Sequence, residues 1–150
     1  MHKKTPAAVG RVLFAGLLAL GLSAGASAAS APDYLFINKS SEVLIDDATV
    51  KALFAEFVSA KMAKLYPANK WGFATQVEGG LTSGNTCVVT ARVMLLQRNL
   101  PVTTKLLLFK PERMATTFDA LPNASSAQCR ELAKNKLQEA NQALRSVLAP

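Results

Sequence analysis

Apolar residues fill most of the stretch from Thr86 to Gln97, which has the length and composition of a β-strand. Its odd-numbered residues, starting with Cys87, predict a face that packs on the core. Arg98 to Pro101 indicates a short turn, and the β-type run 102–109 follows as an antiparallel partner. We expect the other segments to be arranged around this hairpin. The predicted pairs are Leu95 with Thr104, Val93 with Leu106 and Ala91 with Leu108.

Two segments repeat apolar residues at spacings of three and four, which is typical of a helix with one buried face. The first covers residues 47–66 and ends before Pro67, because proline disfavours helical geometry in the residue before it. The second covers residues 126–148, and Ser125 or Ser126 caps its start. Both helices are expected to pack on the sheet.

The remaining segments give weaker patterns. Residues 71–78 alternate between apolar and polar side chains and predict a half-buried strand, and the glycine-rich residues 79–85 predict a flexible hairpin loop. The apolar run 34–37, or the run that ends at Ile45, predicts a short edge strand. Residues 110–123 contain two prolines and predict a connection. This connection is expected to pack through Met114, Phe118 and Leu121.

These elements predict an α+β fold with two layers. Helices 47–66 and 126–148 would cover one face of a three- or four-stranded antiparallel sheet. Cys87 lies on the core face of its strand, and Cys129 lies on the apolar stripe of the second helix near its start. An even number of cysteines in an exported chain favours a disulfide between Cys87 and Cys129 over two buried free thiols.

The first 28 residues predict an export signal. A basic start is followed by an apolar run from Val12 to Leu22, which is too short for a comfortable membrane span, and then by small residues at 26–28. We expect cleavage after Ala28, with Ala29 or Ser30 as close alternatives, and an uncleaved anchor is the alternative to cleavage. Residues 29–150 then form a single domain with no transmembrane segment, in the periplasm or secreted.

Much of the positive charge belongs to this leader. The formal net charge is +7 for the 150 residues, but the part from Ser30 onward has 14 basic and 10 acidic residues, a balance of +4. No run of adjacent Lys and Arg occurs there, so nucleic acid is not expected as a partner.

The chemistry of the exported part argues against an enzyme. It contains no histidine, no serine-hydrolase motif and no metal-binding cysteine cluster, so we predict no catalytic residues, no metal and no cofactor. Asp46 and Asp47 are candidate metal ligands or an acid and base pair, but they lack a nearby third ligand, and capping the helix at 47–66 is the better interpretation. A hydrolase that acts through carboxylates remains a second alternative.

A binding surface is predicted on the face of the sheet opposite the helices. That face should be polar in a plain monomer, yet here it combines apolar residues with positive charge. The candidate partner-binding residues are Arg92, Met94, Leu96, Lys105, Leu107 and Phe109. The alternative is that residues 34–37 or the 111–122 connection cover this patch.

These patterns predict a non-enzymatic accessory or binding protein of the cell envelope. It would dock an envelope protein, or a second copy of itself, through the mixed apolar and basic sheet face. The alternative is a carrier of a small apolar or lipid-like ligand held between helices and sheet. A carrier requires a cavity between the two layers, whereas docking requires a filled core and an exposed patch.

Overall fold

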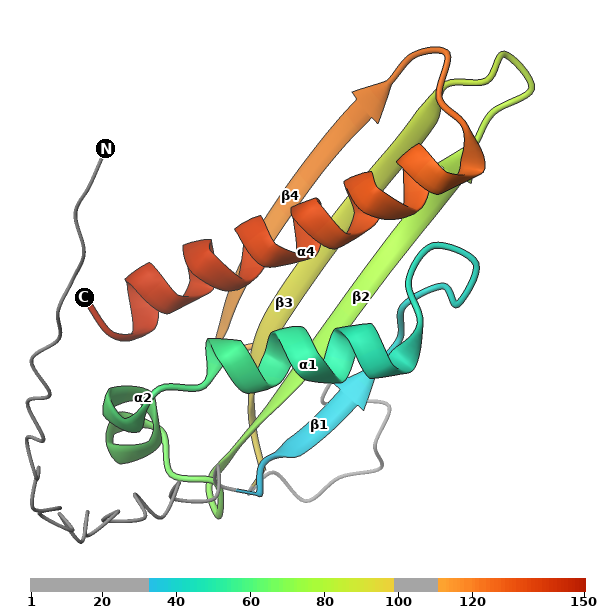
Figure 1. Ribbon diagram of the computed structural model, residues 1–150. Coiled ribbons are helices and arrows are strands. Elements are labelled where there is room, and N and C mark those ends of the chain that lie inside the picture. Colours follow the sequence, from blue (N-terminus) through green and yellow to red (C-terminus); the bar gives the residue numbers. More distant parts are fainter. Residues whose placement is uncertain (1–32, 99–110) are drawn as a thin grey trace, which may run out of the picture.

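The computed structural model describes residues 33–98 and 111–150, which form one sheet with helices packed on it (Figure 1). The strands are β1 Leu35–Asn38, β2 Trp71–Leu81, β3 Cys87–Gln97 and β4 Arg113–Leu121. The helices are α1 Asp47–Phe57, α2 Ala60–Leu65 and α4 Ser126–Leu148. The predicted leader, residues 1–28, lies outside the described residues.

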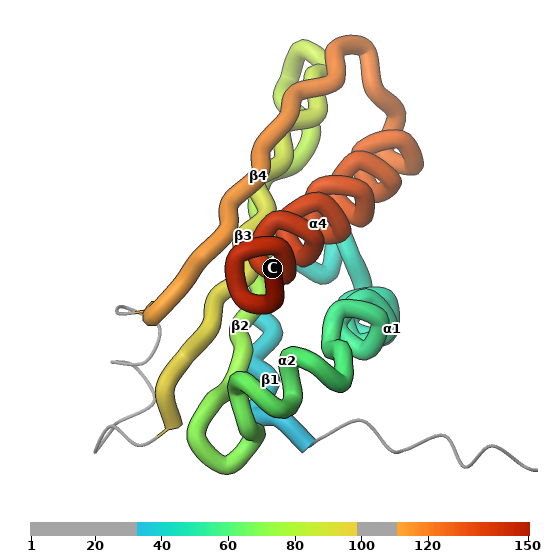
Figure 2. Tube along the Cα trace, turned by 90° about the vertical axis from the view of Figure 1, so that its left-hand side faces the viewer, coloured from blue at the N-terminus to red at the C-terminus, as the bar shows by residue number. Residues whose placement is uncertain are grey.

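The sheet has the strand order β1-β2-β3-β4, and α1 and α4 lie on the same face of it (Figure 2). The two-layer α+β class predicted from the sequence is therefore confirmed. Strands β2, β3 and β4 are antiparallel neighbours, whereas β1 pairs parallel to β2. The sheet is therefore mixed, and the prediction of a purely antiparallel sheet is wrong at the β1 edge. A parallel pair needs a crossover, and the segment that contains α1 and α2 provides it between β1 and β2.

The core lies between the helices and one face of β2 and β3. The odd-numbered residues of β3, among them Val89, Val93 and Leu95, are fully buried on this face, as predicted. Aromatic rings fill the space between the layers: the rings of Phe57 in α1 and Phe73 in β2 meet edge to face, with centroids 5.4 Å apart. Such rings bury large apolar areas and favour this edge-to-face geometry.

The predicted partner of β3 is wrong. Strand β4 pairs with β3 in antiparallel register, with Leu95 opposite Arg113 and Val93 opposite Ala115, in the place predicted for the run 102–109. Strand β2 occupies the other edge of β3. That run itself lies outside the described residues.

The prediction of a packed connection over residues 110–123 is also wrong, because residues 113–121 of this segment form β4 and pair with β3. The segment is an edge strand, and the three residues expected to pack it down are exposed: Met114 by 53%, Phe118 by 72% and Leu121 by 37%. Thr116 and Thr117 at its centre are β-branched and suit a strand. An edge strand that is open on one face lacks the apolar alternation that identifies a buried strand.

The predicted helix at residues 47–66 is interrupted. Helix α1 ends at Phe57, Val58 and Ser59 are extended, and the Ser59 hydroxyl accepts a hydrogen bond from the Met62 N–H to cap α2. A serine side chain competes with the helical backbone in this way. The break turns the chain so that Met62 is fully buried.

The two acidic residues at the start of α1 act as the sequence predicts. Asp46 is the N-cap, and its carboxylate accepts from the Thr49 N–H at 2.8 Å. Asp47 lies in the first turn and forms an ion pair with Lys51 (2.6 Å). The run at residues 34–37 is the source of the edge strand β1, while the run ending at Ile45 forms no strand.

Strand β2 continues through two glycines that were expected to lie in a loop. Gly79 and Gly80 have φ angles of 128° and 148°, which residues with a side chain rarely adopt. They pair with Val89 and Val88 of β3. A Cβ at position 79 would lie 1.9 Å from the Val88 carbonyl oxygen, whereas one at position 80 would meet no atom within 4 Å. Gly79 therefore permits a close approach of two backbones.

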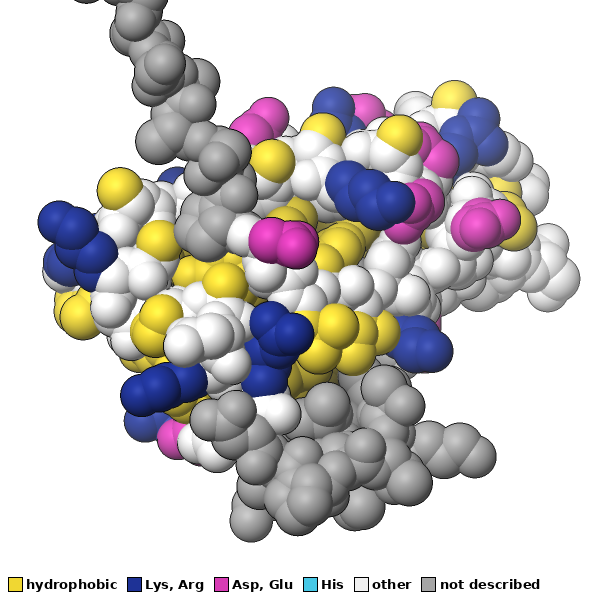
Figure 3. Space-filling view, turned by 90° about the horizontal axis from the view of Figure 1, so that it is seen from below, with side chains coloured by type: hydrophobic (Ala, Val, Ile, Leu, Met, Phe, Trp, Pro, Cys, Tyr) yellow, Lys and Arg dark blue, Asp and Glu magenta, His cyan; other side chains and the backbone are white. Residues whose placement is uncertain are grey.

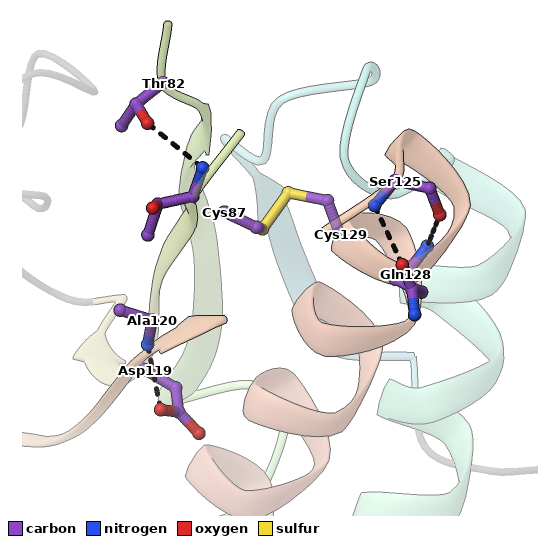
Figure 4. Close-up of a disulfide and its surroundings, with 8 residues drawn as sticks. Thr82, Cys87, Asp119, Ala120, Ser125, Gln128 and Cys129 are labelled. Atoms are coloured by element: carbon purple, nitrogen blue, oxygen red, sulfur yellow. Dashed lines mark hydrogen bonds between the residues drawn. A yellow bond between two sulfur atoms is a disulfide. The ribbon is translucent and has the colours of Figure 1, made fainter. Parts of the chain in front are cut away.

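Helix α4 has the predicted bounds, and Ser125 begins it with a capping box in which its hydroxyl accepts from the Gln128 N–H. The predicted disulfide between Cys87 and Cys129 is present, with the two Cα atoms 5.5 Å apart. Figure 4 shows the two side chains meeting from β3 and from the first turn of α4. The bridge joins the helix layer to the sheet at one end of the molecule.

Removal of this bridge should be costly. The double variant Cys87→Ala/Cys129→Ala should lose about 4 kcal/mol of unfolding free energy, because the bridge closes a loop of 42 residues. Urea unfolding measures this loss. Reduced wild-type protein is the matched control, since it retains the sulfur atoms, and it should show most of the loss. A change below about 1 kcal/mol in both samples would contradict the assigned role.

The two glycines provide a second test. Gly80→Ala should lower the free energy of unfolding by about 1–3 kcal/mol through backbone strain alone. Gly79→Ala should lower it further, because its Cβ also clashes with the Val88 backbone. Thermal and urea unfolding of the two variants measure the difference. Equal losses of unfolding free energy in the two variants would show that the backbones of β2 and β3 are not in close contact at Gly79.

Candidate interaction surface

The face of the sheet opposite the helices, which we call the open face, carries the even-numbered residues of β3 and their partners in the neighbouring strands. Its apolar exposure is concentrated on β4 and the adjoining end of β3: Phe118 is 72% exposed, Met114 53% and Val88 37%. Arg92 lies between them on β3, opposite Thr116, and is half-buried. The open face therefore presents apolar side chains next to a positive charge.

The residues predicted to bind a partner are only partly brought together. Met94 and Leu96 are 5% and 1% exposed and form a second small cluster with Ala74, against which Ile37 packs. Arg92 is accessible in part. Lys105, Leu107 and Phe109 lie outside the described residues. The binding role of this set stays a prediction.

The N-terminal segment covers the open face only locally. Ile37 packs on the small cluster there. Tyr34 and Phe36 point to the helix side instead: the Tyr34 hydroxyl donates to the Tyr66 carbonyl, and the Phe36 ring stacks on Phe54 with centroids 4.3 Å apart. Burial raises the pKa of Tyr34. Within the described part of the patch, residues 34–37 therefore act as a cover only where Ile37 packs on Met94 and Leu96.

Sequence reasoning missed the most exposed aromatic residue of the surface. Phe118 and Met114 were assigned to the core side of a connection, because strand β4 was not recognised. The available signal was the β-branched pair Thr116 and Thr117 within a run of residues that contains no Gly or Pro. The helix face of the strand includes Arg113, Thr117 and Asp119, so it does not show the apolar alternation of a half-buried strand.

The outer edge of β4 presents backbone groups. The Arg98 N–H donates a hydrogen bond to the Lys70 carbonyl (2.8 Å), and these two residues continue the β2–β3 register. The backbone groups of the even-numbered residues of β3 therefore bond to β2. Bonding direction alternates along an antiparallel strand, so odd-numbered β3 residues bond to the odd-numbered residues of β4. The N–H and C=O groups that point to the outer edge of β4 belong to Met114, Thr116, Phe118 and Ala120.

An ionic cluster joins the other face of β4 to α4. Lys136 Nζ lies 3.2 Å from Asp119 and 2.8 Å from Glu139, and the Thr117 hydroxyl donates to the Lys136 carbonyl at 2.7 Å. The pKa of Asp119 is lowered, first by the Ala120 N–H that its carboxylate accepts and then by Lys136. The pKa of Lys136 is raised, chiefly by its hydrogen bond to Glu139.

Described residues of the helix side form two grooves. One, of about 150 Å³, lies between α1 and α4 and is lined by Leu53, Asn141 and Arg145 among others. The other, of about 390 Å³, lies between the segment before α1 and the first turns of α4. Both are bounded by helices and loops, and neither lies between the helices and the sheet.

Other surface features are weaker candidates. The end of the molecule seen from below carries hydrophobic side chains beside those of Lys and Arg (Figure 3), and Leu65 of α2 is exposed. Among residues 33–98 and 111–150, no cluster of three or more His, Cys, Asp or Glu side chains is arranged to hold a metal ion. No helix in the same residues is long and apolar enough to cross a membrane.

Comparisons with known proteins give little beyond this. No family model matches the chain, and no curated protein matches it. Among solved structures it is similar to the PelC dodecamer from Paraburkholderia phytofirmans, with 12% identity over 79% of this chain and 91% of that one and a TM-score of 0.41. A variant of the same dodecamer in another crystal form has 10% identity over 75% of this chain and 88% of that one, with a TM-score of 0.38. At these values the similarity carries no argument about function or assembly.

The ionic cluster generates a pH prediction. Asp119 has a lowered pKa in the folded protein, so its stabilising contribution is fully present above its ordinary value of 3.8 and is lost as the pH falls through the lower folded value. Asp119→Asn should therefore be less stable than wild type at pH 7, and the difference should narrow as the pH is lowered below 3.8.

Urea unfolding of wild type, Asp119→Asn, Lys136→Met and the double variant at each pH measures this coupling as a double-mutant cycle. The coupling between the two positions should be present at pH 7 and decline on acidification. A coupling that is absent at pH 7, or unchanged in acid, would contradict the ion pair between β4 and α4.

Proposed function

We propose that this chain is an exported, non-enzymatic binding module of the cell envelope that docks a protein partner through the open face of its sheet. The observation that carries the proposal is the exposed apolar group of Val88, Met114 and Phe118 beside Arg92. The water-exposed face of an antiparallel sheet is ordinarily polar. Aromatic residues, Met and Arg are the side chains enriched at protein interfaces.

The disulfide supports the cellular setting of this proposal. The bridge between Cys87 and Cys129 fits an exported protein, because such bonds persist in oxidising compartments and are rare in the cytosol. The basic and apolar leader at residues 1–28 gives the same indication from the sequence. A periplasmic or secreted location is part of the proposal.

The packing between the layers favours docking over the carrier of an apolar ligand. The rings of Tyr34, Phe54, Phe57 and Phe73 form a contiguous cluster between α1 and the sheet, with centroid distances of 5.1–6.4 Å. Both grooves lie on the outside of the helices. Space for a buried lipid chain would have to be made by displacing these rings.

The local roles of the carboxylates favour binding over hydrolysis. Asp46 caps α1, Asp47 pairs with Lys51, and Asp119 and Glu139 hold Lys136. A glycosidase-type mechanism needs two carboxylates that flank a substrate bond. The side chains named here serve helix capping and the attachment of β4 to α4.

Capture experiments on the open face test the proposal. The mature disulfide-bonded protein, immobilised and exposed to an envelope extract of its source organism, should retain a partner that the variant Val88→Ser/Phe118→Ser loses. Phe118 is 72% and Val88 37% exposed, so the double variant should remain folded and lose no more than about 2 kcal/mol of unfolding free energy.

The matched control is Val43→Ser/Val147→Ser, which removes two exposed apolar side chains away from the sheet face. It should retain the same partner. Equal capture by both double variants would refute docking through the open face. Unfolding of Val88→Ser/Phe118→Ser would show that these side chains belong to the core and would also refute it.

A further inference from the structure

The two edges of the sheet differ in length and in protection. Strand β1 has four residues, whereas β4 has nine. Natural sheets commonly protect an edge with Lys, Pro or a bulge, and β4 contains neither Lys nor Pro and pairs with β3 without a register break from Arg113 to Leu121. Within the described residues, no strand pairs with its outer side. Its charged residues, Arg113 and Asp119, lie toward its two ends, and the backbone edge between them is unpaired among the described residues.

The backbone of β4 restricts how that strand can pair. Met114, Thr116 and Phe118 direct their N–H and C=O groups outward, because the odd-numbered residues bond to β3. Further along, the Ala120 N–H is already accepted by the Asp119 carboxylate at 2.8 Å. A new strand therefore has its hydrogen bonds at three alternate positions centred on Thr116.

We propose that this strand is β4 of a second copy of the chain, paired antiparallel about a two-fold axis at Thr116. In this register Thr116 lies opposite Thr116 of the second copy. Met114 then faces Phe118 of the second copy on the open face, where both side chains are exposed. On the helix side, Arg113 faces Asp119 of the second copy. The two sheets become one sheet of eight strands.

Charge complementarity selects both this occupant and this register. Within one copy Arg113 contacts Glu112 and Asp119 contacts Lys136, but their side chains remain 57% and 50% exposed, so each can also reach an opposing charge. The two-fold axis duplicates the contact, and the pair of copies gains two Arg–Asp contacts. Any shift of the strands separates Arg113 from Asp119 and loses both contacts, because only the Thr116-centred register places them opposite each other.

This inference goes beyond partner docking and is tested separately from it. Arg113 and Asp119 share the face that carries Lys136 of α4, away from the open face. Substitution there alters pairing between copies and leaves Val88 and Arg92 unchanged. Pairing would cover Met114 and Phe118 in part and leave Val88 and Arg92 for another protein.

A charge exchange tests the register. Sedimentation velocity of the mature, disulfide-bonded protein over a concentration series should show monomer converting to dimer. Arg113→Asp and Asp119→Arg each place like charges opposite one another, so each single variant should raise the dissociation constant at least about tenfold. The double variant R113D/D119R restores both contacts with reversed polarity and should dimerise like wild type.

Mixing provides a stricter control within the same experiment. An equimolar mixture of the two single variants should form a heterodimer, because each contact then joins opposite charges. Loss of the internal contact between Asp119 and Lys136 cannot produce this rescue, since mixing does not restore it. Thermal unfolding of each variant verifies that it is folded.

Disulfide trapping tests the register independently of charge. Thr116→Cys should cross-link to itself under mild oxidation, because paired strand residues have Cα atoms about 5.5 Å apart. Met114→Cys is the matched control on the same face of the same strand. Its two copies would lie about 13 Å apart, at four residues of about 3.3 Å each, so it should cross-link only when mixed with Phe118→Cys.

Three results would overturn the proposal. Wild type could remain monomeric throughout the concentration series. The charge exchange and the mixture could fail to recover the dimer that the single variants lose. Met114→Cys could cross-link to itself as readily as Thr116→Cys. Capture of a partner by a monomeric R113D variant would leave the proposed function standing, and a dimer that captures no partner would leave this inference standing.

Discussion

The structure depends on one buried face of strand β3. Val89, Val93 and Leu95 on that face have no exposed surface, and the same face begins with Cys87, which is bonded to Cys129 of α4. Burial of apolar surface determines which side of the sheet the helices cover, and the disulfide determines where along the strand the long helix starts. The helices leave the other face of the sheet uncovered, and its exposed apolar side chains lie on β4 and the adjoining end of β3.

Strand β4 is held on one side and exposed on the other. Its helix side is attached to α4 through the contact of Asp119 with Lys136 and the hydrogen bond of Thr117 to the Lys136 carbonyl. Its opposite side exposes Met114 and Phe118, and its outer edge presents backbone groups. A strand whose position is set by a long helix can present such groups in a constant geometry. Exposed apolar side chains and open backbone groups on one strand are suited to association with another protein chain.

The sequence predicts best those elements whose signal is local and strong. The bounds of α4, the core face of β3 and the disulfide follow from periodicity and from cysteines placed on facing apolar stripes. The break at Ser59 was missed, because a serine that caps α2 leaves the apolar period of the helix nearly unchanged. Strand β4 was missed, because the more apolar run 102–109 gave a stronger strand pattern. The same error placed residues of the run 102–109 in the candidate surface. Two distant segments compete to pair with β3, and the residue pattern within either segment does not show which of them pairs.

The most direct test of the β4 edge as an interaction surface is amide hydrogen exchange at low and high concentrations of the mature protein. The backbone N–H groups of Ala115 and Thr117 are hydrogen-bonded to β3 and should exchange slowly at both concentrations. The backbone N–H groups of Thr116 and Phe118 point to the outer edge of β4. They should exchange fast in the dilute sample and slowly in the concentrated one. Exchange at Thr116 and Phe118 that is fast at every concentration would contradict the account.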